Sequence, residues 1–267
     1  MCTLGNIKLV TYALSLVNEV FQFAWPHRSA LLDLLRSDLP LQCARSKTLE
    51  RSEHKDNFEN ITMSNYQLIY FPLRGRGQAT RYLFVDNGID YKEENCAQDW
   101  IKTYKPKMPF GQSPLLKDGD FEVAQSNTIM RHLGRKHGLY PSDLQEAAKA
   151  DMITDHVEDI RGPYVRMIYQ NYENGKDDFV KTLPEKLGYI ENLFKKWGTE
   201  YITTKISFAD YILFDLLDTL QILTPTCIDA LPTLKAFYDR MASRPNLKKY
   251  RETEEFKKMP VNGNGKQ

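Results

Sequence analysis

The segment of residues 110–133 constrains the fold more than any other, because it contains three local structural signals in a fixed order. Ser113-Pro114 predicts an extended or turned dipeptide, since a proline ring disfavours the helical conformation for the residue before it. The following residues 115–123 read as two short strands joined by Asp118-Gly119, which is typical of a β-hairpin. Apolar residues at helical spacing then predict a helix that starts at about Ser126.

This order of elements is compatible with a site for an anion or an extended peptide. A helix N-terminus presents free N–H groups and a partial positive charge. A non-helical segment that ends in proline leaves neighbouring backbone groups free to pair with an extended ligand. A hairpin followed by a capped helix, with no ligand, explains the same pattern, so the local residues leave both interpretations open.

Length and composition exclude several classes of protein. A chain of 267 residues suggests one or two domains, and a net charge of +1 argues against a strong general attraction for nucleic acid. The five histidines form no His-Glu-x-x-His motif, so we expect no metal site. No apolar run approaches about 18 residues, and we expect no membrane span. The cysteines are widely spaced and without a Cys-x-x-Cys motif, which favours a reducing compartment: Cys2, Cys43, Cys96 and Cys227.

Residues 1–63 differ in character from the rest and are interpreted as an N-terminal extension. Residues 9–25 are apolar enough for a helix, and a signal peptide was considered, but no convincing small-residue cleavage site follows. Residues 45–60 are charged and polar, which predicts a flexible linker. The triplet at Asn60 is a glycosylation site only if the chain is secreted.

Residues 64–141 predict an α/β domain. The aromatic and branched residues 66–71 indicate a strand that stops at Pro72, and residues 78–87 have the spacing of a helix closed by Gly88. A second strand is expected at residues 91–95, followed by an irregular segment, 100–111, and then the hairpin and helix. The order β-α-β, loop, β-β-α is a thioredoxin-like arrangement, a mixed sheet with helices on both faces.

Residues 142–267 predict an all-α domain, reached through a linker at residues 139–141. Ser142 is the expected N-cap of its first helix, and Gly162-Pro163 is an expected kink. Ser207 and Asp210 form a capping-box pair, and the loss of Ser207 should cost about 1 kcal/mol of stability. Helical spacing covers residues 145–171 as one or two helices, then residues 176–196, 207–223 and 231–243.

Three motifs together resemble cytosolic glutathione transferases, most closely the Pi class, over residues 64–267. They are Tyr70-Phe71-Pro72-x-Arg74-Gly75-Arg76, Gln112-Ser113-Pro114, and Gln125-Ser126-Asn127-Thr128-Ile129-Met130-Arg131-His132-Leu133-Gly134. The resemblance implies an α/β thioredoxin-like domain followed by an all-α domain, with the proline at 114 in the cis form. Met63 is similar to an ordinary start of such a chain.

The resemblance implies an enzyme that conjugates the thiolate of glutathione to hydrophobic electrophiles, with Tyr70 as the catalytic residue. A free thiol has a pKa of about 8.5, so a thiolate at neutral pH requires a pKa lower by roughly 2 units, or about 2.7 kcal/mol. A phenol that donates a hydrogen bond to the sulfur favours the anion. Without the resemblance, the sequence favours the interpretation of Tyr70 as one more half-buried strand aromatic.

The same resemblance assigns glutathione-binding roles to a set of polar residues. Gln112 and Ser113 would bind the cysteinyl backbone, Trp100 and Lys105 the glycine carboxylate, although the register between residues 91 and 111 is a residue or two short. The others would hold the γ-glutamyl part or border the site: Gln125, Ser126, Arg76, and Asp159 from the partner subunit.

The electrophile pocket and the dimer contact are also implied by the resemblance. Phe110 corresponds to an aromatic that inserts into the neighbouring subunit, so a homodimer is expected. The reactive cysteine that Pi-class chains often carry is absent near Met108, and we expect no inactivation through it. The implied pocket residues are Phe71, Leu73, Tyr169, Asn262 and Gly263.

The expected partners are therefore glutathione, a hydrophobic electrophile and a second copy of the chain, with no nucleic acid and no membrane. The expected location is cytoplasmic, and no cofactor is expected beyond the co-substrate glutathione. A non-catalytic binding or regulatory protein on the same fold, which sequesters ligands or restrains a stress kinase, is the alternative. The natural electrophile and any role of residues 1–62 stay open.

Overall fold

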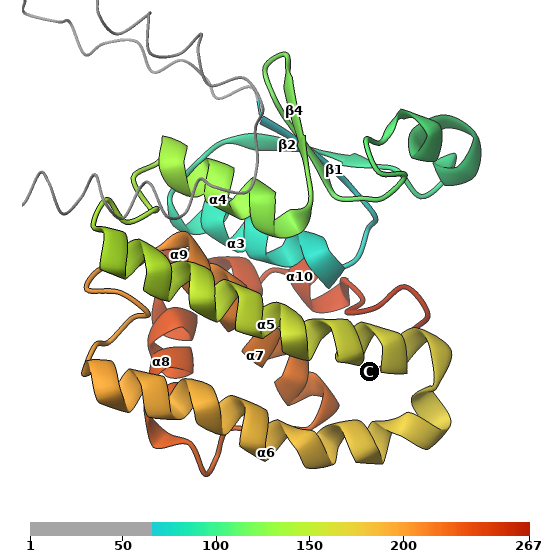
Figure 1. The fold of residues 1–267 in the computed structure, drawn as a ribbon. Helices are drawn as coiled ribbons and strands as arrows, with labels where there is room; N and C mark the ends of the chain where they lie inside the picture. The colour runs from blue at the N-terminus through green and yellow to red at the C-terminus, as the bar shows by residue number, and fades with distance from the viewer. Residues whose placement is uncertain (1–65) are drawn as a thin grey trace, which may run out of the picture. The chain divides into compact units, whose positions relative to one another are not determined.

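The computed structural model describes residues 66–267, and the extension and linker expected before Tyr66 lie outside the described residues. The described chain begins with an α/β region and continues as a set of helices (Figure 1). This order confirms the expected fold class. The exact domain boundary near residue 141 stays a prediction.

A four-stranded mixed sheet forms the α/β region, with the strand order β2-β1-β3-β4. β1 pairs in parallel with β2 and antiparallel with β3, and β3 pairs antiparallel with β4. The parallel pair requires a crossover, which α3 (Gln78–Asp86) provides. The strand bounds are β1 (Tyr66–Tyr70), β2 (Tyr91–Asn95), β3 (Leu115–Asp118) and β4 (Phe121–Ala124).

The alternation of side chains along β1 divides its residues between two cores. Tyr66, Leu68 and Tyr70 join the large core on the side of α3 and α4 (Ser126–Lys136), whereas Ile69 belongs to a small core on the opposite face. That small core also contains Cys96, Met108 and Leu115, with Trp100 and Tyr104 packed against it. The segment of η2 (Trp100–Tyr104) and η3 (Lys105–Lys107) packs over this small core. Short helical turns therefore form where the sequence predicted an irregular loop.

The remaining helices form the second region, in which the long α5 and α6 run side by side and α7 packs against α5 (Figure 1). α7 is the centre of this region, because nearly all of its residues are buried. α3 and α4 lie between the sheet and these helices (Figure 1) and both contact α7. The bounds are α5 (Leu144–Gln170), α6 (Tyr172–Trp197), α7 (Phe208–Leu223), α8 (Pro232–Ser243), α9 (Pro245–Arg251) and α10 (Glu254–Lys258).

The capping box before α7 is confirmed. The buried Asp210 carboxylate accepts hydrogen bonds from the Ser207 N–H at 2.7 Å and the Ser207 hydroxyl at 2.8 Å, and from the Ile202 N–H at 2.9 Å. Burial raises the pKa of Asp210 to about 6, and these donors act against that rise. The motif therefore joins the start of α7 to the loop that precedes it.

The expected N-cap of α5 is wrong. Asp143, not Ser142, caps the helix, since its carboxylate accepts the Gln145 N–H at 2.9 Å and the Glu146 N–H at 3.0 Å. An aspartate at this position also places negative charge beside the positive end of the helix dipole. α5 then continues as one helix through Pro163.

The last two helices were not predicted from the sequence. α9 starts at Pro245, which is suited to a first helical position, and α10 is capped by Thr253. Both are too short for a clear apolar period, and each buries one apolar residue, Leu247 and Phe256. Within the described residues, none of the helices has the length and apolar content needed to span a bilayer.

The cap assignment can be tested by stability. Asp143→Ala should lower the free energy of unfolding by about 1 kcal/mol, because two N–H groups lose their acceptor. Ser142→Ala, its matched neighbour, should stay within about 0.5 kcal/mol of the wild type. Urea unfolding of both variants measures the difference, and a larger effect at Ser142 would contradict the assignment.

Candidate active site

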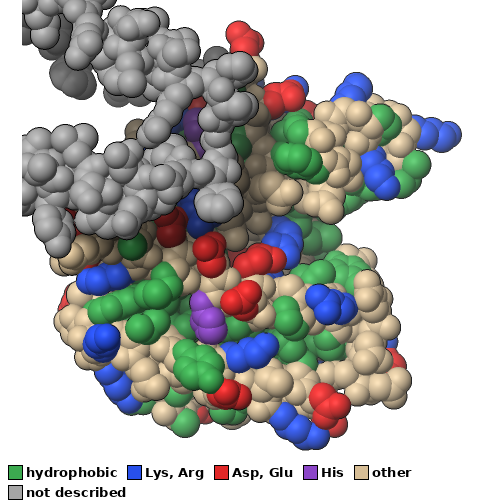
Figure 2. All heavy atoms as spheres, viewed as in Figure 1, with side chains coloured by type: hydrophobic (Ala, Val, Ile, Leu, Met, Phe, Trp, Pro, Cys, Tyr) green, Lys and Arg blue, Asp and Glu red, His purple; other side chains and the backbone are tan. Residues whose placement is uncertain are grey.

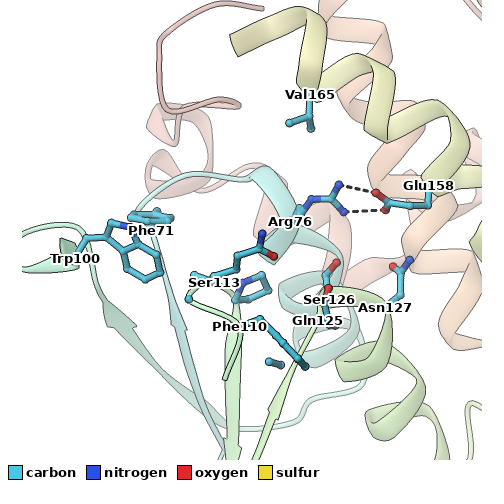
Figure 3. Close-up of a pocket in the computed structure, with 14 residues that line it drawn as sticks. Phe71, Arg76, Trp100, Phe110, Ser113, Gln125, Ser126, Asn127, Glu158 and Val165 are labelled. Carbon is cyan, nitrogen blue, oxygen red and sulfur yellow. Dashed lines mark hydrogen bonds and ion pairs between the residues drawn. The ribbon is translucent and has the colours of Figure 1, made fainter. Parts of the chain in front are cut away.

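A cavity of about 610 Å³ lies between the α/β region and α5 (Figure 3). One wall comes from the segment around Pro114 and from the end of β4 with the start of α4. The opposite wall comes from α5, through Glu158 and Val165. The remaining lining residues are Phe71, Arg76, Trp100, Phe110, Gly111, Gln112, Ser113, Ala124, Gln125, Ser126 and Asn127.

The two segments that frame this cavity have unusual backbone conformations. The Ser113–Pro114 peptide bond is cis, as the resemblance implies, and the Ser113 hydroxyl donates to the Ile69 carbonyl at 3.0 Å. Gln125 has a φ of 70°, in the left-handed region that non-glycine residues rarely adopt. Such a conformation costs about 1–3 kcal/mol and is concentrated at functional sites. It turns the chain from β4 directly into α4, whose free N–H groups begin at the cavity wall.

A bidentate ion pair connects the α/β region to α5 at this cavity. The Arg76 guanidinium donates to the two carboxylate oxygens of Glu158 at 2.8 and 2.6 Å (Figure 3). The hydrogen bonds to Glu158 raise the pKa of Arg76, so its guanidinium stays protonated at any physiological pH. The sequence gives no local signal for this pair, because Arg76 and Glu158 are 82 positions apart.

Tyr70 ends β1 with its side chain buried. Its hydroxyl oxygen accepts the main-chain N–H of Arg76 at 2.8 Å. Burial raises the pKa of Tyr70 above its usual value near 10, although the Arg76 N–H and the charges of Arg81 and Arg76 oppose the rise. The phenol is therefore neutral at pH 7, with its own O–H proton available to donate.

Glycines make room for the Tyr70 ring. A Cβ atom on Gly77 would lie 2.6 Å from Cδ1 of Tyr70, and one on Gly75 would lie 2.5 Å from its hydroxyl oxygen. Gly75 also has a φ of 39°, which side chains disfavour. The Gly-Arg-Gly sequence of η1 (Gly75–Gly77) thus brings the Arg76 N–H to the phenol without a clash.

The Tyr70 ring lines a second, smaller cavity of about 110 Å³, which shares Arg76 and Val165 with the larger one. Arg161 lines it too, and its guanidinium donates to Asp215 at 2.7 Å. Burial raises the pKa of Asp215 to about 6. The remaining lining residues are Leu73, Gly75, Tyr164, Tyr169, Thr219, Val261 and Asn262.

The C-terminal segment that follows α10 closes this smaller cavity. The carbonyls of Pro260 and Val261 accept the N–H groups of Arg74 at 2.8 Å and Gly75 at 3.1 Å. The next residues bind α5: the Asn262 amide donates to the Tyr164 hydroxyl at 2.7 Å, and the Gly263 N–H donates to the Tyr169 hydroxyl at 2.8 Å. The segment therefore ties the loop after β1 to α5.

The structure brings most of the expected site residues to the two cavities. Phe71 lines the larger cavity, and its ring packs on Trp100 with centroids 5.0 Å apart. Lys105 and Asp159 line neither cavity, and both are exposed. Those in the larger cavity are Phe71, Arg76, Trp100, Phe110, Gln112, Ser113, Gln125 and Ser126; those in the smaller one are Tyr70, Leu73, Tyr169 and Asn262, with Gly263 bonded to Tyr169.

Several lining residues were missed from the sequence, among them Asn127, Val165, Arg161 and Thr219. Asn127 is the second residue of α4, so its place at a helix start was a usable signal. The other three lie inside long helices, where spacing alone predicts which residues are buried but not that a cavity borders them.

Exposed lysines mark the lobe formed by η2 and η3, whose blue side chains are visible in Figure 2. They are Lys102, Lys105 and Lys107. Trp100 of the same lobe lines the larger cavity, and the Lys105 side chain lies beside Gly111 of its lining, where a positive charge favours an anionic ligand. No group of potential metal ligands is present among the described residues.

Family models match both regions of the chain. The model described as glutathione S-transferase, N-terminal domain, matches residues 66–135, and the model described as glutathione S-transferase, C-terminal domain, matches residues 158–254.

Known proteins match the same part of the chain. Glutathione S-transferase P from Bos taurus is 48% identical over 210 residues, and its counterpart from Homo sapiens is 47% identical, each covering 77% of this chain and 100% of the relative. The solved structure of the Pi-class glutathione S-transferase from Onchocerca volvulus is 43% identical, with a TM-score of 0.73, and covers 76% of this chain and 100% of that one.

The close packing of Gly77 against the Tyr70 ring can be tested by substitution. Gly77→Ala should lower the free energy of unfolding by about 1–3 kcal/mol, because its methyl group overlaps the phenol ring. Gly188→Ala is the matched control, since a Cβ there meets nothing within 4 Å in α6, and it should be neutral or stabilising by up to about 1 kcal/mol. Equal stability of the two variants in urea would refute close packing at Gly77.

Proposed function

Because the chain belongs to the glutathione S-transferase family, we propose that it joins the thiolate of glutathione to electrophilic, hydrophobic small molecules. Detoxification of such compounds is the biological role that this chemistry fits. A non-catalytic protein on this fold is the less favoured alternative, since it has no need of a buried, neutral phenol in the wall of a cavity.

One observation carries the proposal: the Tyr70 hydroxyl is fixed as an acceptor by the Arg76 N–H and keeps its own proton for another partner. A thiolate is such a partner. A hydrogen bond from the phenol favours the anionic sulfur over the thiol and lowers the pKa of the thiol. Tyr70 need not remove the proton, because its own pKa is raised and it stays neutral.

Glutathione is proposed to bind in the larger cavity as an extended tripeptide. Gln112 and Ser113 are suited to its cysteinyl backbone, next to the cis proline. The start of α4 suits the γ-glutamyl carboxylate, since Gln125 and Ser126 lie beside free helix N–H groups. Trp100 lies at the other end with the lysine lobe, where the glycine carboxylate would find Lys105 within the same segment.

The electrophile is proposed to bind in the smaller cavity beside Tyr70. Leu73 supplies an apolar wall, and Tyr169 supplies a half-exposed phenol whose oxygen is held by Gly263. Binding the two substrates in adjoining cavities replaces a bimolecular encounter by an oriented approach. The sulfur then forms a bond to the electrophilic carbon, and either a leaving group departs or the added electron pair takes a proton.

A homodimer is proposed on two exposed side chains. The Phe110 ring is 66% exposed although it borders the larger cavity, so it is available to a pocket of another copy. Asp159 faces solvent rather than either cavity of its own chain, as expected of a residue that serves the partner's site. We further propose a cytoplasmic location and no cofactor beyond the co-substrate glutathione.

The role of Tyr70 is tested by Tyr70→Phe. The pKa of glutathione bound to this variant should rise by about 2 units toward that of the free thiol, because the hydrogen bond to sulfur is lost. The pH profile of kcat/KM with a chromogenic aryl halide should shift upward by the same amount, so the loss of activity is about tenfold at about one pH unit below the new pKa, greater at lower pH, and small above it.

Tyr66→Phe is the matched control, because Tyr66 lies on the same strand, its hydroxyl contacts His137 at 2.9 Å, and neither residue lines a cavity. This variant should keep the wild-type pH profile. An unshifted profile in Tyr70→Phe would remove Tyr70 from the mechanism, and a wild type without activity would favour a non-enzyme.

The dimer is tested by Phe110→Ala. Removal of an exposed aromatic that fills a partner's pocket should weaken association by about 2 kcal/mol or more. Sedimentation equilibrium of the wild type should give twice the chain mass, and the variant should dissociate at a higher concentration. Phe121→Ala, at another exposed aromatic, serves as comparison, and a monomeric wild type would contradict the proposal.

A further inference from the structure

A buried carboxylate outside both cavities connects the helical region to the loop that follows Tyr70. Asp218 lies on α7, is 6% exposed and lines neither cavity. It accepts hydrogen bonds from the hydroxyls of Tyr82 at 2.9 Å and Tyr238 at 2.8 Å, and it pairs with Arg251 at 2.5 Å and Arg74 at 3.5 Å. Of these residues only Arg74 belongs to one of the sequence motifs, and the others were not singled out from the sequence.

The two oxygens of Asp218 serve different parts of the molecule. Oδ1 binds Tyr238 of α8 and Arg251 of α9, both within the helical region. Oδ2 binds Tyr82 of α3 and faces Arg74 of the loop after β1, both within the α/β region. One carboxylate group therefore joins the two regions, with one oxygen directed to each.

Charge makes Asp218 difficult to replace. Among the described residues it is the carboxylate that forms an ion pair with Arg74, and likewise with Arg251. The Nε atoms of both arginines are buried without a hydrogen-bond partner, and their other contacts are to neutral groups: Arg74 to the Phe256 carbonyl at 3.4 Å and Arg251 to the Tyr238 hydroxyl at 2.9 Å. The next acid on α7, Asp215, is already paired with Arg161. Loss of the Asp218 charge would leave two largely buried cations without a counter-ion.

Arg74 connects Asp218 to the turn that contacts the Tyr70 hydroxyl. Its side chain lies over the Phe256 ring at 4.0 Å and reaches Asp218, while its carbonyl accepts the Gly77 N–H at 3.2 Å. The turn from Arg74 to Gly77 contains the Arg76 N–H that holds the Tyr70 hydroxyl at 2.8 Å. The contacts of the Arg74 side chain with Asp218 and Phe256 thus fix the turn that orients Tyr70.

We propose that Asp218 is a positioning residue for glutathione activation: through Arg74 it holds the turn whose Arg76 N–H sets the Tyr70 hydroxyl. This inference rests on the proposed function for its effect on catalysis. Its structural part concerns the turn alone and is measurable without glutathione.

The experiment compares Asp218→Asn with Arg74→Met, and Tyr238→Phe is the matched control. Asp218→Asn keeps the shape of the side chain and removes the charge, and Arg74→Met removes the loop partner. Tyr238→Phe removes one hydrogen bond from the same carboxylate, but from Oδ1, the oxygen directed away from the loop.

Two readouts separate positioning from stability. Hydrogen exchange of the Arg76 amide in glutathione-free protein should be about tenfold faster in Asp218→Asn and Arg74→Met than in the wild type and Tyr238→Phe. The pKa of bound glutathione, followed by the ultraviolet absorption of the thiolate, should rise by about one unit in the same two variants. The double variant should show no further rise, because both changes break one link.

Wild-type exchange and wild-type thiol pKa in Arg74→Met would overturn the proposal, and this variant remains informative if Asp218→Asn does not fold. An equal effect of Tyr238→Phe would overturn it as well, since general loosening would then explain the result. If the wild type forms no thiolate while Arg76 exchange still responds to Asp218→Asn and Arg74→Met, the proposed function fails and the structural link stands.

Discussion

The active site depends on one buried contact, the hydrogen bond between the Arg76 main chain and the Tyr70 hydroxyl. A phenol at the end of a strand is useful for thiol chemistry only if its oxygen is held in place and its proton is kept. Burial keeps the proton on the phenol by raising the pKa of Tyr70, and the turn over Gly75–Gly77 holds the oxygen in place. Contacts from both regions of the fold hold this turn next to the Tyr70 ring.

Both regions of the fold contribute to that turn. Arg81, fully buried on α3, pairs with Glu93 and donates to the Leu73 carbonyl at 2.7 Å, so the loop is held from the sheet side. The helical region acts through Glu158, which fixes the Arg76 side chain, and through Asp218, which meets Arg74. The boundary between the regions is therefore a part of the site, and neither region alone contains it.

The sequence predicted the elements better than the contacts between them. β1 and α7 were found because aromatic, branched and other apolar residues are concentrated in them, whereas α9 and α10 were too short to show an apolar period. The cap of α5 was placed one residue early, since Ser142 and Asp143 are both good caps and only the fold decides between them.

At the site, local motifs located Tyr70, Gln125 and Ser126, because the chemistry there is encoded in consecutive residues. Pairs that are distant in sequence were not predictable in this way. Arg76 and Glu158 are 82 positions apart, and Tyr82 and Asp218 are 136 apart, so each partner alone looks like an ordinary surface or core residue. The register around Lys105 stayed uncertain because η2 and η3 have no regular period.

The segment after α10 has a consequence for biosynthesis. Pro260 and Val261 accept hydrogen bonds from Arg74 and Gly75, residues that leave the ribosome almost 190 positions earlier. The loop beside Tyr70 therefore acquires these two hydrogen bonds only after residues 260 and 261 have been synthesised. A nascent chain that ends before them already carries the motif residues around Tyr70 but lacks the backbone partners of Arg74 and Gly75.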